Sequence, residues 1–166
     1  MSRTPILAFD LATSTGWALR ARDGRVTSGE QRFELKRGES PGMRWLRFRA
    51  WLREMIALGE LGAREGVIGL IAYERPIVAG RGFSAGITRE LAAVVQEECA
   101  SRELHSTDVA AATLKKHATG KGNSKKDAMA AAARARWGET ASGELGEDQA
   151  DALCVLAWAL DEIGEG

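Results

Sequence analysis

Two apolar segments of this chain end on a carboxylate, and this pattern constrains the fold more than any other feature. Residues 5–9 (PILAF) are followed directly by Asp10, and the nearly continuous apolar run 67–74 (VIGLIAYE) closes on Glu74. Apolar runs of this length predict buried strands, the second of them covered on both faces. Because a buried carboxylate is costly unless it is paired, hydrogen-bonded or bound to a cation, the fold has to supply each acid with a partner.

The order of the remaining segments predicts a hairpin first and alternating strands and helices afterwards. Strands are expected at 16–20 and 25–35, and Asp23-Gly24 between them is a strong two-residue turn signal. A helix capped by Ser40-Pro41 is expected to run to about residue 61. The later segments predict helices over 84–101, 108–118, 123–137 and 147–163, with a short strand over 103–106. The prediction is an α/β fold with a mixed five-stranded sheet, an antiparallel meander followed by parallel strands, flanked by helices on both faces.

Length and composition favour one soluble domain. The 166 residues suit a single domain over 1–166, without repeats or a low-complexity tract. The first residues lack the features of a secretory leader, and the longest uncharged apolar run, 152–160, is far shorter than a membrane span. Cys99 and Cys154 fall in predicted helices without metal-ligand spacing and are expected to be reduced, packed thiols. We therefore expect a cytoplasmic protein with no membrane partner.

Charge is strongly segregated along the chain although its net value is zero. Residues 113–137 hold seven Lys or Arg and one acid, whereas residues 138–166 hold eight acids and no Lys or Arg. Four more arginines lie close together at positions 44, 47, 49 and 53. The segregation is compatible with a cationic surface beside an acidic site, as a metal-dependent nuclease requires, and equally with a solvated acidic tail beside a basic helix.

Four acids are expected to converge at one edge of the sheet. Strands joined through a helix are usually parallel neighbours, so Asp10 and Glu74 should emerge together where open α/β sheets bind ligands. In the last helix, Asp148 and Asp151 are three residues apart and share a face, whereas Glu147 before them suits the helix dipole. Four carboxylates at one point suit two Mg²⁺ or Mn²⁺ ions, which can clamp a phosphodiester between them.

The motifs also resemble a known family. The strand-ending Asp10, a hydroxyl-rich turn and Gly16-Trp17 are similar to the first motif of the RNase H-like superfamily. With Glu74 and the Asp148-x-x-Asp151-Ala-Leu sequence, the chain resembles the RuvC-type Holliday junction resolvases over nearly its whole length. Residues 113–129 (TLKKHATGKGNSKKDAM) resemble the segment before the final helix, especially in phage-type members.

The resemblance implies a function and a set of roles. It implies a homodimer, in a bacterial or phage-infected bacterial cell, that nicks two opposed strands of four-way or branched DNA and leaves 5′-phosphate and 3′-hydroxyl ends. Asp10, Glu74, Asp148 and Asp151 would be both the catalytic residues and the ligands of two Mg²⁺ or Mn²⁺ ions. We expect the dimer interface on the helix over 84–101, with Leu91, Val94 and Val95 as contacts.

One position departs from the family pattern. Members often carry an aromatic side chain three residues after the second acid, as a wedge at the junction centre, but this chain has Ile77 there, preceded by Pro76. The next aromatic residue is Phe83, so either Phe83 stacks at the branch point or no aromatic does. Arg81 beside it is a further candidate DNA contact.

A lysine-rich turn supplies the candidate DNA-binding residues. Two glycines and the start of a helix form a phosphate cradle in many proteins, and five lysines surround such a turn here: Lys115, Lys116, Lys121, Lys125 and Lys126. The alternative is a solvated helix pair with ordinary surface lysines. Thr13 and Ser14 either touch a phosphate or close the first turn, and His105 and His117 are candidate general bases that could equally be structural.

Three other functions fit parts of the sequence. The same fold serves nucleases that act on RNA–DNA hybrids or structured RNA. The segment DLATSTG also resembles the phosphate loop of actin-like ATPases and sugar kinases, although those proteins close two such domains around a nucleotide. A DNA-binding module that no longer cuts is the third alternative.

Overall fold

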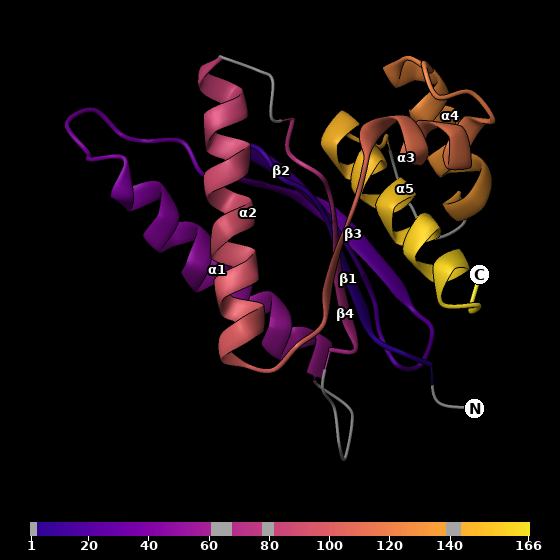
Figure 1. Cartoon of the computed structure of the whole chain (residues 1–166), viewed down its shortest axis with the longest axis horizontal. Coiled ribbons are helices and arrows are strands. Elements are labelled where there is room, and N and C mark those ends of the chain that lie inside the picture. Colours follow the sequence, from indigo (N-terminus) through magenta and orange to yellow (C-terminus); the bar gives the residue numbers. More distant parts are fainter. Residues whose placement is uncertain (1–2, 61–67, 78–81, 139–143) are drawn as a thin grey trace.

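Five strands form one mixed sheet at the centre of the molecule (Figure 1). The computed structural model describes residues 3–60, 68–77, 82–138 and 144–166. The strands are β1 (Ile6–Asp10), β2 (Ser14–Arg20), β3 (Val26–Arg32), β4 (Leu70–Glu74) and β5 (Ser106–Val109). Their order is β3-β2-β1-β4-β5, with β1–β2 and β2–β3 antiparallel and β1–β4 and β4–β5 parallel. This arrangement confirms the predicted meander followed by parallel strands.

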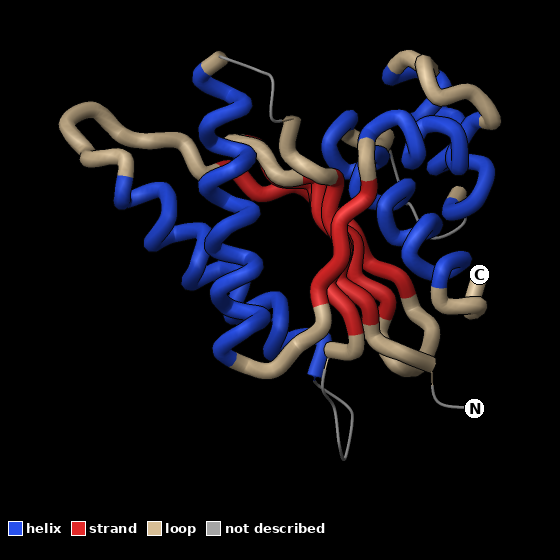
Figure 2. Tube along the Cα trace, in the orientation of Figure 1, coloured by secondary structure: helices blue, strands red, loops and turns tan. Residues whose placement is uncertain are grey.

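Helices cover both faces of the sheet, as predicted (Figure 2). The five helices are α1 (Gly42–Glu60), α2 (Phe83–Ser101), α3 (Ala111–Thr119), α4 (Lys126–Trp137) and α5 (Glu147–Glu162). Helices α1 and α2 lie together on one face, whereas α3, α4 and α5 lie on the other (Figure 1).

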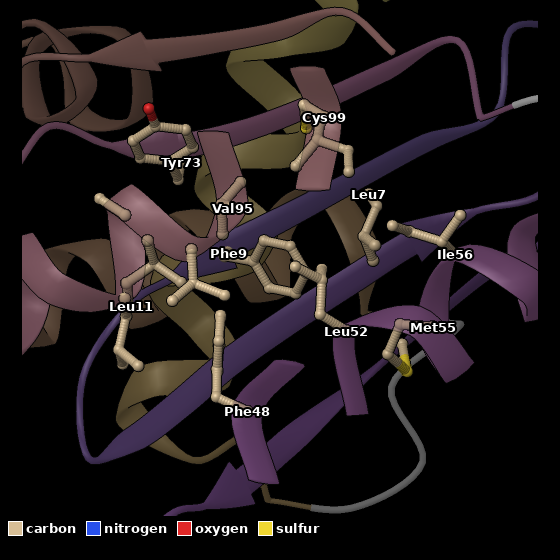
Figure 3. Packing of buried hydrophobic residues seen from close by; sticks show 14 of the residues in the cluster. Leu7, Phe9, Leu11, Phe48, Leu52, Met55, Ile56, Tyr73, Val95 and Cys99 are labelled. Atoms are coloured by element: carbon tan, nitrogen blue, oxygen red, sulfur yellow. The ribbon is translucent and has the colours of Figure 1, made fainter. Parts of the chain in front are cut away.

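Alternation along β1 divides the core into two clusters. Leu7 and Phe9 point to the face covered by α1 and α2, and Ile6 and Ala8 point to the face covered by α5. Phe9 lies at the centre of the first cluster, among side chains from both helices (Figure 3). Its ring centroid is 5.6 Å from that of Trp51 in α1. Because the period of a strand is two, the parity of each residue decides which cluster it joins.

The main boundary error of the sequence reading lies around β5. The predicted strand over 103–106 and the predicted helix start at Asp108 are both wrong, because the strand spans Ser106–Val109 and α3 begins at Ala111. Glu103 has a left-handed φ of 57°, and the N–H of Leu104 donates to the carbonyl of Cys99 at 2.9 Å. These residues therefore belong to the turn that closes α2. Helix α4 also begins later than predicted, at Lys126.

The arginines of α1 do not form a free cationic surface, which corrects that interpretation of the sequence. Arg47 pairs with Glu39, and Arg49 and Arg53 pair with Glu98 of α2 at 3.0 and 2.8 Å. Arg44 is buried and donates to the carbonyl of Phe33 at 3.0 Å. These side chains join α1 to its neighbours, so the cationic surface has to come from elsewhere.

The three side chains expected as dimer contacts on α2 are not on the surface, and the interface itself stays a prediction. Leu91, Val94 and Val95 are buried inside the single chain, in the cluster between the sheet and α1. Cys99 and Cys154 are free and buried, as predicted. Among the described residues, no helix combines the length and apolarity that crossing a membrane requires.

Candidate active site

Asp10 and Glu74 lie side by side at the ends of two neighbouring parallel strands. In the β1–β4 register Phe9 is opposite Tyr73, so the next residues along the strands, the two acids, are adjacent. Both follow alanines, Ala8 and Ala72, by two residues, and these alanines belong to the cluster under α5. Strand alternation therefore directs both carboxylates to the α5 face.

Helix α5 brings the other two acids to the same place. Asp148 and Asp151 lie in its first and second turns, and the helix packs on β1 and β2. Gly16 of β2 is the register partner of Asp10, and a Cβ placed on it would be 1.7 Å from the carbonyl oxygen of Asp148. The absence of a side chain at Gly16 thus lets the first turn of α5 approach the sheet next to Asp10.

Burial and neighbouring charges raise the pKa values of three of the four acids. Burial first, and then the charges of Asp151, Glu74 and Asp148, together raise the pKa of Asp10 to about 8, against the opposing effect of Lys126. The pKa of Asp151 is raised to about 6, first by burial and then by Glu74. Burial also raises the pKa of Glu74, against the opposing effect of Lys115. The negative charges around Asp10 and Asp151 therefore disfavour the ionised form of these two carboxyl groups.

Two cavities meet at Asp10 and Glu74. The first, of about 540 Å³, is lined by these acids and Asp151 and also by Lys115, Lys125 and Lys126. The second, of about 280 Å³, extends from the same two acids towards the start of α2; its lining also includes Leu11, Pro76, Ile77, Ser84 and Thr88. The acids thus lie between a cationic cavity and a largely apolar one.

The donor set fits hard divalent cations. The four side chains offer only carboxylate oxygens, which Mg²⁺ and Mn²⁺ prefer, and the raised pKa of Asp10 reflects a buried acid with too little positive charge nearby. In the described part of the chain, no three Asp, Glu, His or Cys side chains are close enough to hold one ion as they stand. Ion binding would therefore have to draw these mutually repelling carboxylates together.

Three of the five predicted lysines line the site and two do not. Lys115, Lys125 and Lys126 line the cationic cavity, and the Nζ of Lys126 is 2.7 Å from Oε2 of Glu147. Lys116 and Lys121 are exposed outside its lining. Gly120, with a φ of 83°, ends α3 in the left-handed conformation and turns the chain towards α4. This turn places lysines from both helices next to the acids.

The hydroxyls after β1 differ in their roles. The Oγ1 of Thr15 donates to the carbonyl of Ala12 at 2.7 Å and closes the turn, and the carbonyl of Thr13 accepts from the N–H of Phe33 at 2.8 Å. The Oγ of Ser14 is buried and has no hydrogen-bond partner among the described residues. A phosphate contact thus remains a prediction for Thr13 and Ser14.

The remaining predicted residues lie around the site or away from it. Phe83, the first residue of α2, is 79% exposed, with the guanidinium of Arg44 6.0 Å from its ring centroid. Arg81 lies outside the described residues. His117 pairs with Asp161 at 2.6 Å, which supports the structural reading of this histidine. The backbone carbonyl of His105 accepts from the N–H of Ile71 at 3.0 Å.

Three residues, Gly16, Glu30 and Gln149, join the first turn of α5 to the sheet, and the sequence alone did not predict these contacts. Gly16 was read as part of a motif, and its contact with Asp148 depends on a pairing that no local pattern reveals. Glu30 of β3 accepts from the N–H of Gln149 at 3.2 Å, and Gln149 contacts Ser28 of the same strand. The largely polar sequence of β3 (VTSGEQR) did not indicate that this strand contacts α5.

Comparison with known proteins identifies the fold. No family model and no curated protein matches the sequence. The structure is similar to Thermus thermophilus RuvC, with a TM-score of 0.75 and 16% identity over 98% of each chain. It is equally similar to T. thermophilus RuvC in complex with Holliday junction substrate, with a TM-score of 0.76, 16% identity and the same coverage. The chain therefore has the RNase H-like fold of RuvC, which confirms the predicted fold class.

Proposed function

We propose that this chain is a metal-dependent endonuclease that resolves four-way or branched DNA junctions by phosphodiester hydrolysis. The observation that carries the proposal is that Asp10, Glu74 and Asp151 line one cavity together with three lysines, with the charge of Asp148 near enough to raise the pKa of Asp10. A divalent-ion site next to a cationic surface suits a phosphate backbone. The likeness to a RuvC structure that contains a Holliday junction supports junction DNA as the substrate.

The acids have the central role in this proposal. Asp10, Glu74, Asp148 and Asp151 would hold two Mg²⁺ or Mn²⁺ ions through carboxylate oxygens. When bound, such ions would lower the pKa of the attacking water and stabilise the leaving 3′-oxygen. Water would then form the new bond to phosphorus as the P–O3′ bond breaks, leaving 5′-phosphate and 3′-hydroxyl ends. The parallel pairing of β1 and β4, which makes Asp10 and Glu74 neighbours, and the close approach of α5 to Gly16 support this proposal.

The lysines would bind the DNA backbone. Lys115, Lys125 and Lys126 line the cavity that opens onto the acids, so a phosphate there would contact the lysines and approach the acids at once. Lys116 and Lys121 would extend this cationic surface along the strand. Because such contacts carry no base information, each should contribute to affinity without sequence preference.

The apolar cavity and Phe83 would serve junction recognition. The cavity runs from Asp10 and Glu74 to the first turns of α2, and the exposed ring of Phe83 begins that helix. An unstacked base at a branch point could stack on this ring, as bases do on exposed aromatic side chains. A homodimer would present two such sites to two opposed strands, with an interface outside the buried residues of α2.

The direct test compares three substrates of equal length in Mg²⁺. These are a synthetic four-way junction, a linear duplex and an RNA–DNA hybrid, each labelled on every strand. We expect paired nicks in the junction, with ligatable ends, and at least about tenfold slower cleavage of the duplex and the hybrid. Faster cleavage of the hybrid would instead assign the chain to RNA-directed nucleases, and binding without cleavage would leave a DNA-binding module.

The dimer is tested separately by sedimentation. We expect a sedimentation mass of two chains at micromolar concentration, and a complex of two chains with one junction. A complex with one chain per junction would exclude the paired-nick mechanism, although it would leave metal-dependent cleavage untouched.

A further inference from the structure

Helix α5 begins without a capping side chain of its own. Its N-cap residue is Gly146, with extended backbone angles (φ −64°, ψ 156°), and a glycine has no oxygen to offer the free N–H groups of the first turn. Without another partner, backbone N–H groups of the first turn, which carries Asp148, would lack a hydrogen-bond acceptor. Another part of the chain has to supply the cap.

Glu30 of β3 takes that place. Its Oε1 accepts from the N–H of Gln149 at 3.2 Å, as an N-cap side chain would in an ordinary helix. A Cβ built on Gly146 would be 1.9 Å from the same oxygen, so Glu30 occupies the space that a capping side chain would fill. The carboxylate also lies at the positive end of the helix dipole, where it is favoured.

Gln149 makes a second link between the same two elements. Its Oε1 accepts from the N–H of Gly146 at 3.3 Å, and its Nε2 donates to Oγ of Ser28 at 2.9 Å. One side chain thus closes the first turn of α5 and binds it to β3. The cap of this helix is at the same time its attachment to the edge of the sheet.

The attachment points lie in one row across the sheet. Asp10 of β1 is opposite Gly16 of β2, and Gly16 is opposite Glu30 of β3. The first turn of α5 crosses this row, resting on Gly16 and held by Glu30 at its outer end. Any movement of α5 away from Glu30 would change the distance between Asp148 and Asp10, because the turn is a rigid helical unit.

We propose that Glu30 and Gln149 are positioning residues that hold the first turn of α5 on β3 and thereby place Asp148 and Asp151 where they can share divalent ions with Asp10 and Glu74. The inference rests on the proposed metal site, and neither residue contacts an ion or DNA in it. Outer hydrogen bonds of this kind commonly change metal affinity about tenfold or more, because ligand carboxylates have to be held in place.

The test measures Mn²⁺ affinity directly, by calorimetry on the full chain without DNA. We expect Glu30→Ala and Gln149→Ala to weaken Mn²⁺ binding about five- to tenfold each, and the double variant to be less than additive because both serve one attachment. Glu30→Gln keeps the accepting oxygen and removes the charge, and it should bind Mn²⁺ within about twofold of the wild type. Glu34→Ala, which removes an exposed acid paired with Arg32, is the matched surface control.

A rescue variant separates position from helix capping. Gly146→Ser in the Glu30→Ala background restores a cap within α5 but not the attachment to β3. We expect it to recover the melting temperature of the wild type while Mn²⁺ binding stays weak. If Gly146→Ser recovered the melting temperature and Mn²⁺ binding together, Glu30 would act only as a helix cap. If Glu30→Gln weakened Mn²⁺ binding as much as Glu30→Ala does, the effect would come from the charge of Glu30. Either result would overturn the inference. A wild type that binds no Mn²⁺ would instead refute the proposed metal site.

Discussion

The backbone carbonyl of Asp148 lies directly over Gly16, so close that a methyl group on Gly16 would be 1.7 Å from its oxygen. The contact joins the first turn of α5 to β2 at the register partner of Asp10. Since the obstructing atoms are backbone, no side-chain rotation can relieve a clash there. The position of two candidate ligands thus depends on a residue that has no side chain.

Gly16→Ala should therefore inactivate the protein without altering any acid. We expect α5 to shift at its start, junction cleavage to fall at least about tenfold, and the junction dissociation constant to stay within about threefold. The unfolding free energy should fall by about 1–3 kcal/mol, as for other overpacked sites. Single-turnover cleavage, a binding assay in Ca²⁺ and urea unfolding measure these three quantities. Gly42→Ala, at an open position of α1, is the control, and an active Gly16→Ala would contradict this account.

Asp10→Asn should stabilise the ion-free protein. Burial, Asp151, Glu74 and Asp148 raise the pKa of Asp10 from 3.8 to about 8, so the folded chain holds a proton that the unfolded chain releases. The stability of the wild type therefore falls as pH rises from about 4 to about 8, and an amide at this position removes that loss. We expect Asn to add about 1–3 kcal/mol to the unfolding free energy at pH 8 and little at pH 4.

Mg²⁺ should reverse the stability difference between Asp10→Asn and the wild type. The wild type gains stability by binding the ion, whereas Asp10→Asn has lost a ligand and should gain less. Thermal unfolding at pH 8, with and without Mg²⁺, checks both effects. Asp127 is exposed in the first turn of α4, so Asp127→Asn should neither stabilise the ion-free protein nor reduce the stabilisation by Mg²⁺. A destabilised, pH-independent Asp10→Asn variant would show that Asp10 lacks the crowded acidic environment described above.

Lys126→Gln should weaken DNA binding evenly across sequences. Lys126 lines the cationic cavity and contacts Glu147 at 2.7 Å, where both side chains are largely exposed. Loss of one phosphate contact should lower the slope of log affinity against log salt by about one. Fluorescence anisotropy at several salt concentrations measures the slope. Lys36→Gln, on the loop before α1, should leave it unchanged, and an unchanged slope for Lys126→Gln would remove this lysine from the DNA surface.

Glu98 should make the fold sensitive to acid. It is buried in α2 with only 3% of its side chain exposed. Hydrogen bonds from Arg53 above all, and from Arg49 and Arg102, lower its pKa to about 2 despite its burial. The stabilisation is therefore present above pH 4.5 and is lost as pH falls towards 2.

Glu98→Gln tests this network. We expect it to lower the unfolding free energy by about 1–3 kcal/mol at pH 7, with the difference from the wild type shrinking below about pH 4. Glu97→Gln is the neighbouring control, because Glu97 is exposed and, among the described residues, forms an ion pair with Arg49 only. Chemical unfolding across pH measures both variants. A pH-independent difference would mean that Glu98 contributes through packing and not through its charge.

Much of the fold could be predicted because local signals agreed with one another. The apolar strands ending at Asp10 and Glu74, the Asp23-Gly24 turn and the helix stop at Gly120 all appear in the structure where the sequence indicated them. The strand β5 was misplaced because it is short and polar, so that its pairing with β4 decides its position. A single sequence contains no record of that pairing.

The four acids of the candidate site could be singled out from the sequence, whereas the residues that join α5 to the sheet beside them could not. Asp148 and Asp151 follow a helical spacing that is evident in the sequence, and a buried carboxylate requires a hydrogen bond, an ion pair or a bound cation. Glu30 and Gln149 look like ordinary surface residues, and their contact spans 119 positions of sequence. The pairing of Arg49 and Arg53 of α1 could not be predicted for the same reason, since their partner Glu98 comes from α2.

The most direct test of the central claim is cleavage of a synthetic four-way junction in Mg²⁺ by the wild type, Asp10→Asn and Asp151→Asn, with junction binding measured in parallel. We expect both variants to bind the junction within about threefold of the wild type and to lose at least about a thousandfold in cleavage rate, because ligand acids act on the chemical step. Glu162→Gln, at the far end of α5, should cleave normally. Cleavage at the wild-type rate by both acid variants would contradict the assignment of these carboxylates as the metal site.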